Sequence, residues 1–131
     1  MLDIIEAIKR ASIHIYNELK LGETELSKNK NTSGDEQLKI DVISDDIIEY
    51  ELRQANAVKA IISEEKEELK TINPNGRYLV GYDPIDGSSL IDVNQSVGSI
   101  FGIYENDFSG VNLRAAAYAI YGPKLELVIA V

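Results

Sequence analysis

The chain of 131 residues has no cysteine, no tryptophan, one histidine and three prolines. Without cysteine it can form neither disulfide bonds nor thiolate metal sites, which excludes the usual structural zinc centres. The single histidine, His14, has no second imidazole with which to share a metal ion, so we interpret it as a structural residue. Any metal site in this protein must therefore be built from oxygen ligands.

The chain is also short of basic residues and of long apolar runs. Its 13 Lys and Arg residues stand against 22 Asp and Glu, a formal net charge of −9, which argues against nucleic acid or an anionic membrane as a partner. No apolar run approaches the roughly 20 residues of a membrane span, and the first residues lack a signal-peptide pattern. We therefore expect a soluble, cytoplasmic protein with no membrane partner.

Hydrophobic periodicity predicts an α+β fold. Apolar residues recur at helical spacing over 2–20 and again over 35–55, separated by a polar segment at 22–34 that we predict to be a surface loop. Five apolar or β-branched runs then read as strands, the last two forming a hairpin: 58–63, 77–82, 97–104, 113–121 and 125–131. Because the chain ends inside an apolar run, we expect it to be part of a longer protein.

The segment 83–89, with sequence DPIDGSS, concentrates the chemistry. Pro84 fixes its own φ and keeps Asp83 extended, so the chain turns sharply and the carboxylates of Asp83 and Asp86 can converge. Gly87 allows a backbone path that a Cβ would disfavour, and the N–H groups after it resemble a helix N-terminus, which suits a phosphate. Taken alone, the segment could also be an ordinary turn at the end of a strand.

A second pair of acids, Glu64 and Glu65, follows the strand predicted at 58–63. Two strands that each place carboxylates at one end indicate a cation site. Hard oxygen ligands beside an anion-binding segment favour Mg²⁺ over zinc. Asp41 lies near the predicted start of the second helix. Its position leaves two interpretations open, a helix N-cap or a catalytic acid.

Five segments, in order along the chain, resemble class I fructose-1,6-bisphosphatases and the wider Mg²⁺-dependent, lithium-sensitive sugar phosphatases: NTSGDEQLKIDVIS at 31–44, ISEE at 62–65, GRYLVGYDPIDGSS at 76–89, SVGSIFGIY at 96–104 and AAYAIYG at 116–122. The resemblance implies the N-terminal half of a layered α/β fold, with two helices packed on a largely antiparallel sheet. Residues 1–131 would form the metal- and phosphate-binding domain. The C-terminal domain that holds the sugar phosphate is absent from this sequence.

The resemblance also implies roles for individual residues. Metal ligands would be Glu64, Asp83, Asp86 and the carbonyl oxygen of Ile85, for two or more Mg²⁺ ions or for Mn²⁺. Asp86, Gly87, Ser88 and Ser89 would bind the phosphate that leaves. Asp41 and Glu65 would activate the attacking water, and Asp35 would assist near a further metal. The implied function is hydrolysis of the 1-phosphate of fructose 1,6-bisphosphate in gluconeogenesis, by a homo-oligomer that in this family is a tetramer.

Three alternatives remain at this stage. Leu90 stands where fructose bisphosphatases usually have Asn after the double serine. The segments GDEQ and YGPK are also similar to sedoheptulose-1,7-bisphosphatase. Sedoheptulose 1,7-bisphosphate, alone or together with fructose 1,6-bisphosphate, could therefore be the substrate. A haloacid-dehalogenase-like phosphatase would use Asp83 as nucleophile, but its Asp-x-Asp-Gly-Thr motif has one residue fewer between the acids. Finally, this chain by itself could be an inactive fragment that serves only as an assembly module, because an uncovered sheet edge favours association.

Overall fold

The computed structural model describes the backbone of residues 1–26, 33–93 and 95–131, and the side chains of these residues except 22–26, 33–38, 67 and 92–93. Two helices, six strands and two short 3₁₀ helices follow one another in the described chain: α1 (Leu2–Leu26), α2 (Ser33–Arg53), β1 (Val58–Ser63), β2 (Lys66–Thr71), β3 (Tyr78–Asp86), η1 (Ser88–Val93), β4 (Val97–Glu105), η2 (Gly110–Asn112), β5 (Leu113–Tyr121) and β6 (Leu125–Ala130).

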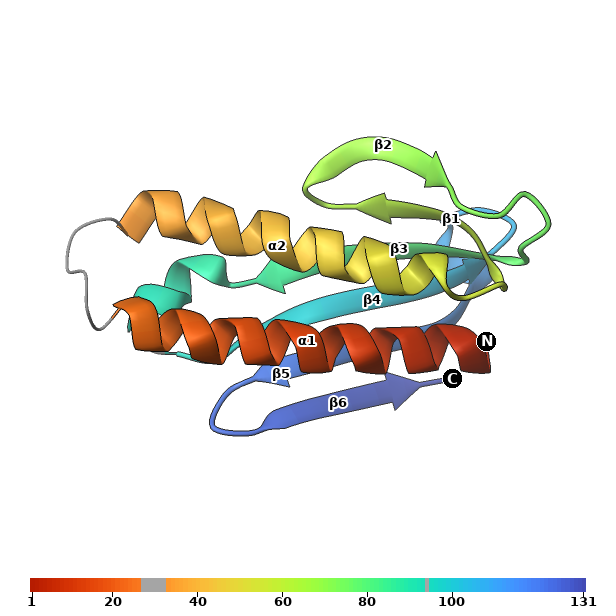
Figure 1. The fold of residues 1–131 in the computed structure, drawn as a ribbon. Helices are drawn as coiled ribbons and strands as arrows, with labels where there is room; N and C mark the ends of the chain where they lie inside the picture. Colours follow the sequence, from red (N-terminus) through yellow and green to blue (C-terminus); the bar gives the residue numbers. More distant parts are fainter. Residues whose placement is uncertain (27–32, 94) are drawn as a thin grey trace.

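The strands form one sheet in the order β2-β1-β3-β4-β5-β6. Only the β1–β3 pair is parallel, and the other neighbours are antiparallel. Both helices run side by side along one face of this sheet (Figure 1). The predicted α+β architecture, with two helices on a largely antiparallel sheet, is confirmed.

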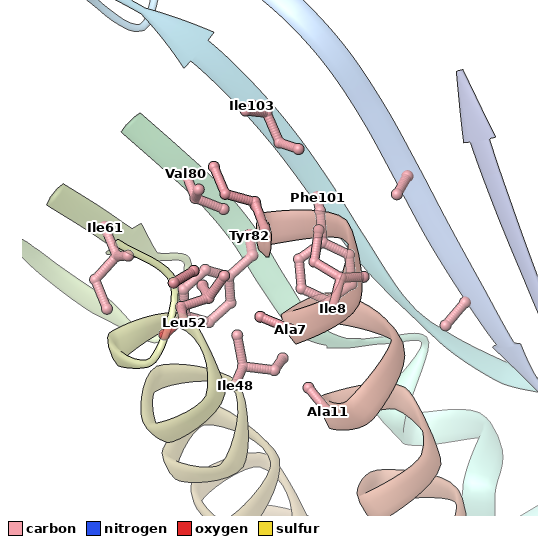
Figure 2. Close-up of a cluster of buried hydrophobic side chains, with 14 of the residues drawn as sticks. Ala7, Ile8, Ala11, Ile48, Leu52, Ile61, Val80, Tyr82, Phe101 and Ile103 are labelled. Carbon is pink, nitrogen blue, oxygen red and sulfur yellow. The ribbon is translucent and has the colours of Figure 1, made fainter. Parts of the chain in front are cut away.

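Apolar side chains of both helices meet alternate residues of the central strands. The stripe predicted on the first helix is buried at Ile4, Ile8, Ala11 and Ile15, as its spacing requires. Figure 2 shows the centre of this core, to which these residues contribute: Ala7, Ile8, Ala11, Ile48, Leu52, Ile61, Val80, Tyr82, Phe101 and Ile103. The helices are thereby fixed over the sheet, and α2 reaches the strand ends that carry the acidic residues.

The other face of the sheet keeps apolar side chains exposed. Ile100 pairs with Tyr118, and Tyr118 pairs with Val128 across β4, β5 and β6. These three side chains are 47%, 45% and 43% exposed. Period-2 alternation places them opposite the helices, so this face has an apolar stripe that no described helix or strand covers.

Two predicted boundaries are wrong. Helix α1 continues to Leu26, and α2 begins at Ser33, so the surface loop predicted over 22–34 is helical at both ends, and its residues 27–32 lie outside the described chain. The segment 22–26 contains no proline and includes good helix formers, which lets the helix continue. Asp41 lies eight residues inside α2, which rules out its interpretation as an N-cap.

The sequence also failed to predict strand β2. Its residues KEELKT carry charges at four of six positions and follow the acidic pair, whereas strand signals rest on apolar and β-branched residues. The strand forms at the edge of the sheet, antiparallel to β1, where charged side chains are common. Its two lysines face acids of α2: Lys66 pairs with Asp45, and Lys70 lies 2.5 Å from Glu49.

Candidate metal and phosphate site

The sharp turn predicted at Pro84 is wrong, because β3 continues to Asp86 and the chain turns at Gly87. The N–H of Ile85 donates a hydrogen bond to Asp83 Oδ1 at 3.1 Å, and the pairing of β3 with β4 shifts register between Asp83 and Asp86. Gly87 has a φ of +79°, in the left-handed region that side chains with a Cβ disfavour. The turn leaves Asp83 half-buried and Asp86 exposed.

Hydroxyl groups on strands β4 and β5 stabilise the backbone at Pro84. The buried Ser99 hydroxyl donates to the Pro84 carbonyl oxygen at 2.5 Å and lies 2.7 Å from the Tyr121 hydroxyl. Burial is the main reason that the pKa of Tyr121 rises to about 12. This phenol therefore stays protonated, and the support of the turn does not depend on pH near neutrality.

Glu64 and Glu65 lie beside this turn because β1 and β3 are parallel. Ser63 pairs with Tyr82 at the ends of the two strands, and the Glu64 N–H donates to the Tyr82 carbonyl oxygen at 2.9 Å. The Glu65 N–H donates to Ser63 Oγ at 3.3 Å. The predicted meeting of two acid-bearing strand ends is thus present in the fold.

Asp41 approaches the same place from helix α2. The Ser88 side chain, at the start of η1, hydrogen-bonds to its carboxylate. Its Oδ1 atom is buried and accepts no hydrogen bond within the described part of the chain. A buried carboxylate oxygen without a donor is unusual, which makes Asp41 a candidate for binding something other than protein.

Electrostatics show that these acids form one group. Burial and the negative charges of Glu64 and Asp86 raise the pKa of Asp83 to about 6. Burial, Asp83 and Glu64 raise the pKa of Asp41, and burial, Asp41 and Glu64 raise the pKa of Glu65. Three elements, α2, the β1–β2 turn and the end of β3, therefore place mutually repelling carboxylates where strands β1 and β3 end.

The donor set fits a hard divalent cation in chemistry and charge. Oxygen ligands with excess negative charge are what Mg²⁺ and Mn²⁺ bind, and the oxygen of Asp41 without a donor supports this fit. In the described residues, no three acidic side chains already converge as ligands of one ion. Glu64 and Asp86 are exposed, so their side chains can adjust around a cation.

The segment expected to seat a phosphate follows directly. The helix η1 begins at Ser88, and the Leu90 N–H donates to the Gly87 carbonyl oxygen at 2.8 Å. Ser88 is half-buried and Ser89 is exposed. The short helical start predicted after Gly87 is present beside the acidic group.

Two other residues were singled out in the sequence, Asp35 and His14. Asp35 belongs to the first turn of α2, but its side chain lies outside the described part of the structure. His14, on α1, is largely exposed and lies 3.5 Å from Glu51. This contact to a carboxylate agrees with a structural interpretation of His14.

Sequence reasoning missed three residues that support the site: Asp45, Ser99 and Tyr121. Each is buried: Asp45 pairs with Lys66, Ser99 donates to the Pro84 carbonyl oxygen, and Tyr121 reaches that segment through Ser99. Asp45 is four residues from Asp41, a spacing that places both on one face of a helix, and this was the one signal available in the sequence.

Comparison with known proteins identifies the family. The family model described as "Fructose-1-6-bisphosphatase, N-terminal domain" matches residues 2–131. The chain belongs to the fructose-1,6-bisphosphatase family. It is 54% identical over 129 residues to the class 1 fructose-1,6-bisphosphatase of Campylobacter jejuni serotype O:2, and 52% identical over 127 residues to that of Campylobacter curvus.

These alignments cover 98% and 97% of this chain but only 46% and 42% of the two relatives. The chain thus spans less than half the length of these fructose-1,6-bisphosphatases. Crystal structures of the Leishmania major fructose-1,6-bisphosphatase also match it. The holo form gives a TM-score of 0.81 at 30% identity, covering 98% of this chain and 42% of the other, and the T-state form gives 0.79 at 29%, covering 98% and 44%.

No helix in the described part of the chain is both long enough and apolar enough to cross a bilayer.

Proposed function

We propose that this chain forms the metal- and phosphate-binding part of a Mg²⁺-dependent fructose-1,6-bisphosphatase, which hydrolyses the 1-phosphate of fructose 1,6-bisphosphate in gluconeogenesis. One observation carries the proposal: Asp41, Glu65 and Asp83 lie beside Gly87–Ser89, and burial together with neighbouring carboxylates, among them Glu64, raises the pKa of each of the three. Proteins seldom gather carboxylates in this way without a cation. Membership of the family supports the same function.

The metal ligands would be Glu64, Asp83, Asp86 and the carbonyl oxygen of Ile85. Bound Mg²⁺, two or more per site with Mn²⁺ as a substitute, would neutralise phosphate charge and make a water more acidic. The exposed carboxylates of Glu64 and Asp86 can reorient, whereas the Ile85 N–H holds Asp83 in place. Asp35 would act near a further metal.

Asp41 and Glu65 would accept the proton of the attacking water. Their raised pKa values bring them nearer to neutrality, where a carboxylate is a better general base. The water oxygen would form a bond to phosphorus as the bond from phosphorus to the C1 oxygen of the sugar breaks, so no covalent enzyme intermediate is required. Asp86, Gly87, Ser88 and Ser89 would bind the departing phosphate, with N–H groups facing its oxygens.

We further propose that the enzyme acts in the cytoplasm as a homo-oligomer, a tetramer by analogy with the family. The support is family membership and the acidic composition, which disfavours binding to nucleic acid or an anionic membrane. Analytical ultracentrifugation would test the oligomeric state.

The test compares this chain with a fusion of it to the C-terminal half of the Campylobacter jejuni relative. We expect the chain alone to bind Mg²⁺ but to release negligible phosphate from fructose 1,6-bisphosphate, because positioning supplies up to about 7–11 kcal/mol of catalysis. The fusion should restore hydrolysis. Parallel assays with sedoheptulose 1,7-bisphosphate would decide between the two sugars.

Each result has a distinct meaning. Rapid turnover by the chain alone would contradict its role as half of a site. A folded fusion without any hydrolysis would contradict the proposed activity and would favour the assembly module.

A further inference from the structure

Asp45 is a buried charge at the back of the candidate site. Its side chain is 1% exposed, and its Oδ2 atom forms an ion pair with Lys66 Nζ. Asp45 follows Asp41 by four residues on α2, and Lys66 follows Glu65 directly. Since a buried carboxylate without a partner is costly, this pair constrains the end of the Glu64–Glu65 turn.

Asp45 also lies next to strand β3. The Tyr82 hydroxyl is close to both Asp45 and Ser63, and burial together with the Asp45 carboxylate raises the pKa of this phenol. Tyr82 immediately precedes Asp83, and its carbonyl oxygen accepts the N–H of Glu64 at 2.9 Å. One carboxylate thus contacts the residue after Glu65 and the residue before Asp83.

Other acids near Lys66 are less suited to this task. Asp46 Oδ1 and Glu49 Oε2 each lie 3.6 Å from Lys66 Nζ, and the Asp46 side chain is 70% exposed. An exposed ion pair fixes little because water competes for both groups. Of these three acids, Asp45 acts most strongly on Tyr82 of β3, ahead of Glu49.

We propose that Asp45 is a positioning residue that fixes the Glu64–Glu65 turn relative to Asp41 and Asp83. The functional value of this arrangement rests on the proposed function, in which these four acids bind metal and activate water. Asp45 itself touches neither in this assignment. It acts through Lys66 and Tyr82, from behind the site.

The experiment compares Asp45→Asn with Asp46→Asn in this chain, since both remove one negative charge near Lys66 at equal side-chain size. Amide hydrogen exchange at Glu64 reports on the turn, and Mn²⁺ affinity measured by electron paramagnetic resonance reports on the site. We expect Asp45→Asn to speed Glu64 exchange and to weaken Mn²⁺ binding about tenfold, within the range for groups that orient metal ligands. Asp46→Asn should stay within about twofold of wild type in both measurements.

Lys66→Met adds a second line of evidence, because it leaves the buried Asp45 carboxylate without its cation. It should weaken Mn²⁺ binding at least as much as Asp45→Asn, and the double variant should recover part of the loss. Because a loss of global stability also speeds amide exchange, Glu64 exchange is compared in each variant with that of the buried Phe101 on β4, which global unfolding speeds as well.

Equal Glu64 exchange in Asp45→Asn and Asp46→Asn would overturn the positioning role. If the wild-type chain binds no Mn²⁺, the metal part of the proposed function fails, and the exchange comparison still decides whether Asp45 fixes the turn.

Discussion

The Ser99 hydroxyl donates a 2.5 Å hydrogen bond to the carbonyl oxygen of Pro84. Ser99 is fully buried on β4, so this bond joins the interior of the sheet to the turn that presents Asp83 and Asp86. The Tyr121 hydroxyl, 2.7 Å from Ser99, continues the link to β5. The turn of the candidate site is therefore anchored through two strands that carry none of the proposed metal ligands.

Ser99→Ala should destabilise the fold by about 1–3 kcal/mol, because it leaves the Pro84 carbonyl without its donor. Urea unfolding followed by circular dichroism measures the change. Tyr121→Phe is the control: it preserves the Ser99–Pro84 bond and should cost only about 1 kcal/mol. Equal stability of Ser99→Ala and wild type would show that the bond contributes nothing.

Asp86→Asn should abolish most activity of the fused enzyme while leaving its melting temperature nearly unchanged. Asp86 is exposed, so the isosteric amide should preserve the turn while removing the negative charge of a proposed metal ligand. Phosphate release should fall by about 100-fold or more, since outer-shell partners of metal ligands alone are worth about 10–100-fold. Asp107→Asn, an exposed acid in the loop before η2, is the matched control. Near-wild-type turnover of Asp86→Asn would refute its role.

Glu65→Gln should separate rate from metal affinity. As a proton acceptor, Glu65 would contribute about 10²–10⁴-fold to the rate, whereas in the proposed assignment other groups would hold Mn²⁺. We expect kcat to fall within that range and Mn²⁺ affinity to change much less. A parallel loss of both quantities would instead identify Glu65 as a metal ligand.

Gly87→Ala should strain the phosphate-binding turn. An added Cβ would lie 3.5 Å from Leu90 Cδ1, an ordinary contact, but the φ of +79° is unfavourable for alanine. The left-handed conformation costs about 1–2 kcal/mol, which chemical denaturation can measure. Gly110→Ala serves as control, because a Cβ there would meet nothing within 4 Å. Comparable stabilities for the two variants would indicate that the turn relaxes freely.

Glu49 should make stability fall at acid pH. Partial burial opposes its ionisation, but hydrogen bonds from Lys70 and Arg53 outweigh burial and lower the pKa of Glu49 to about 2. A lowered pKa stabilises the fold above the unfolded-state value of about 4.5 and loses that contribution as pH falls toward about 2. We expect about 1–2 kcal/mol, after allowance for solvent screening.

Glu49→Gln should therefore be less stable than wild type at pH 7 and equally stable near pH 2, as measured by urea unfolding across this range. Glu126→Gln is the control, since Glu126 pairs only with the exposed Lys124 at 2.8 Å. A constant difference between Glu49→Gln and wild type at all pH values would contradict the assignment.

Local patterns in the sequence were sufficient for most of the fold and for the acids of the site. Helical spacing predicted α1, apolar and β-branched runs predicted five strands, and Gly87 marked the point where the chain turns after β3. Such signals depend on neighbours a few residues apart, so they can be read without a structure. The acids were found for the same reason, because Glu64 and Glu65 directly follow β1, and Asp83 and Asp86 follow the apolar run with which β3 begins.

The tertiary structure alone decided what joins these local pieces. Strand β2 is polar in sequence and is a strand because it pairs with β1 and because its lysines face Asp45 and Glu49 on α2. Asp41 is not a helix cap, since the helix begins eight residues earlier. The contacts of Asp45 with Lys66 and of Ser99 with Pro84 span 21 and 15 residues. Contacts at such separations depend on how helices and strands pack, and neither hydrophobic period nor turn chemistry encodes them locally.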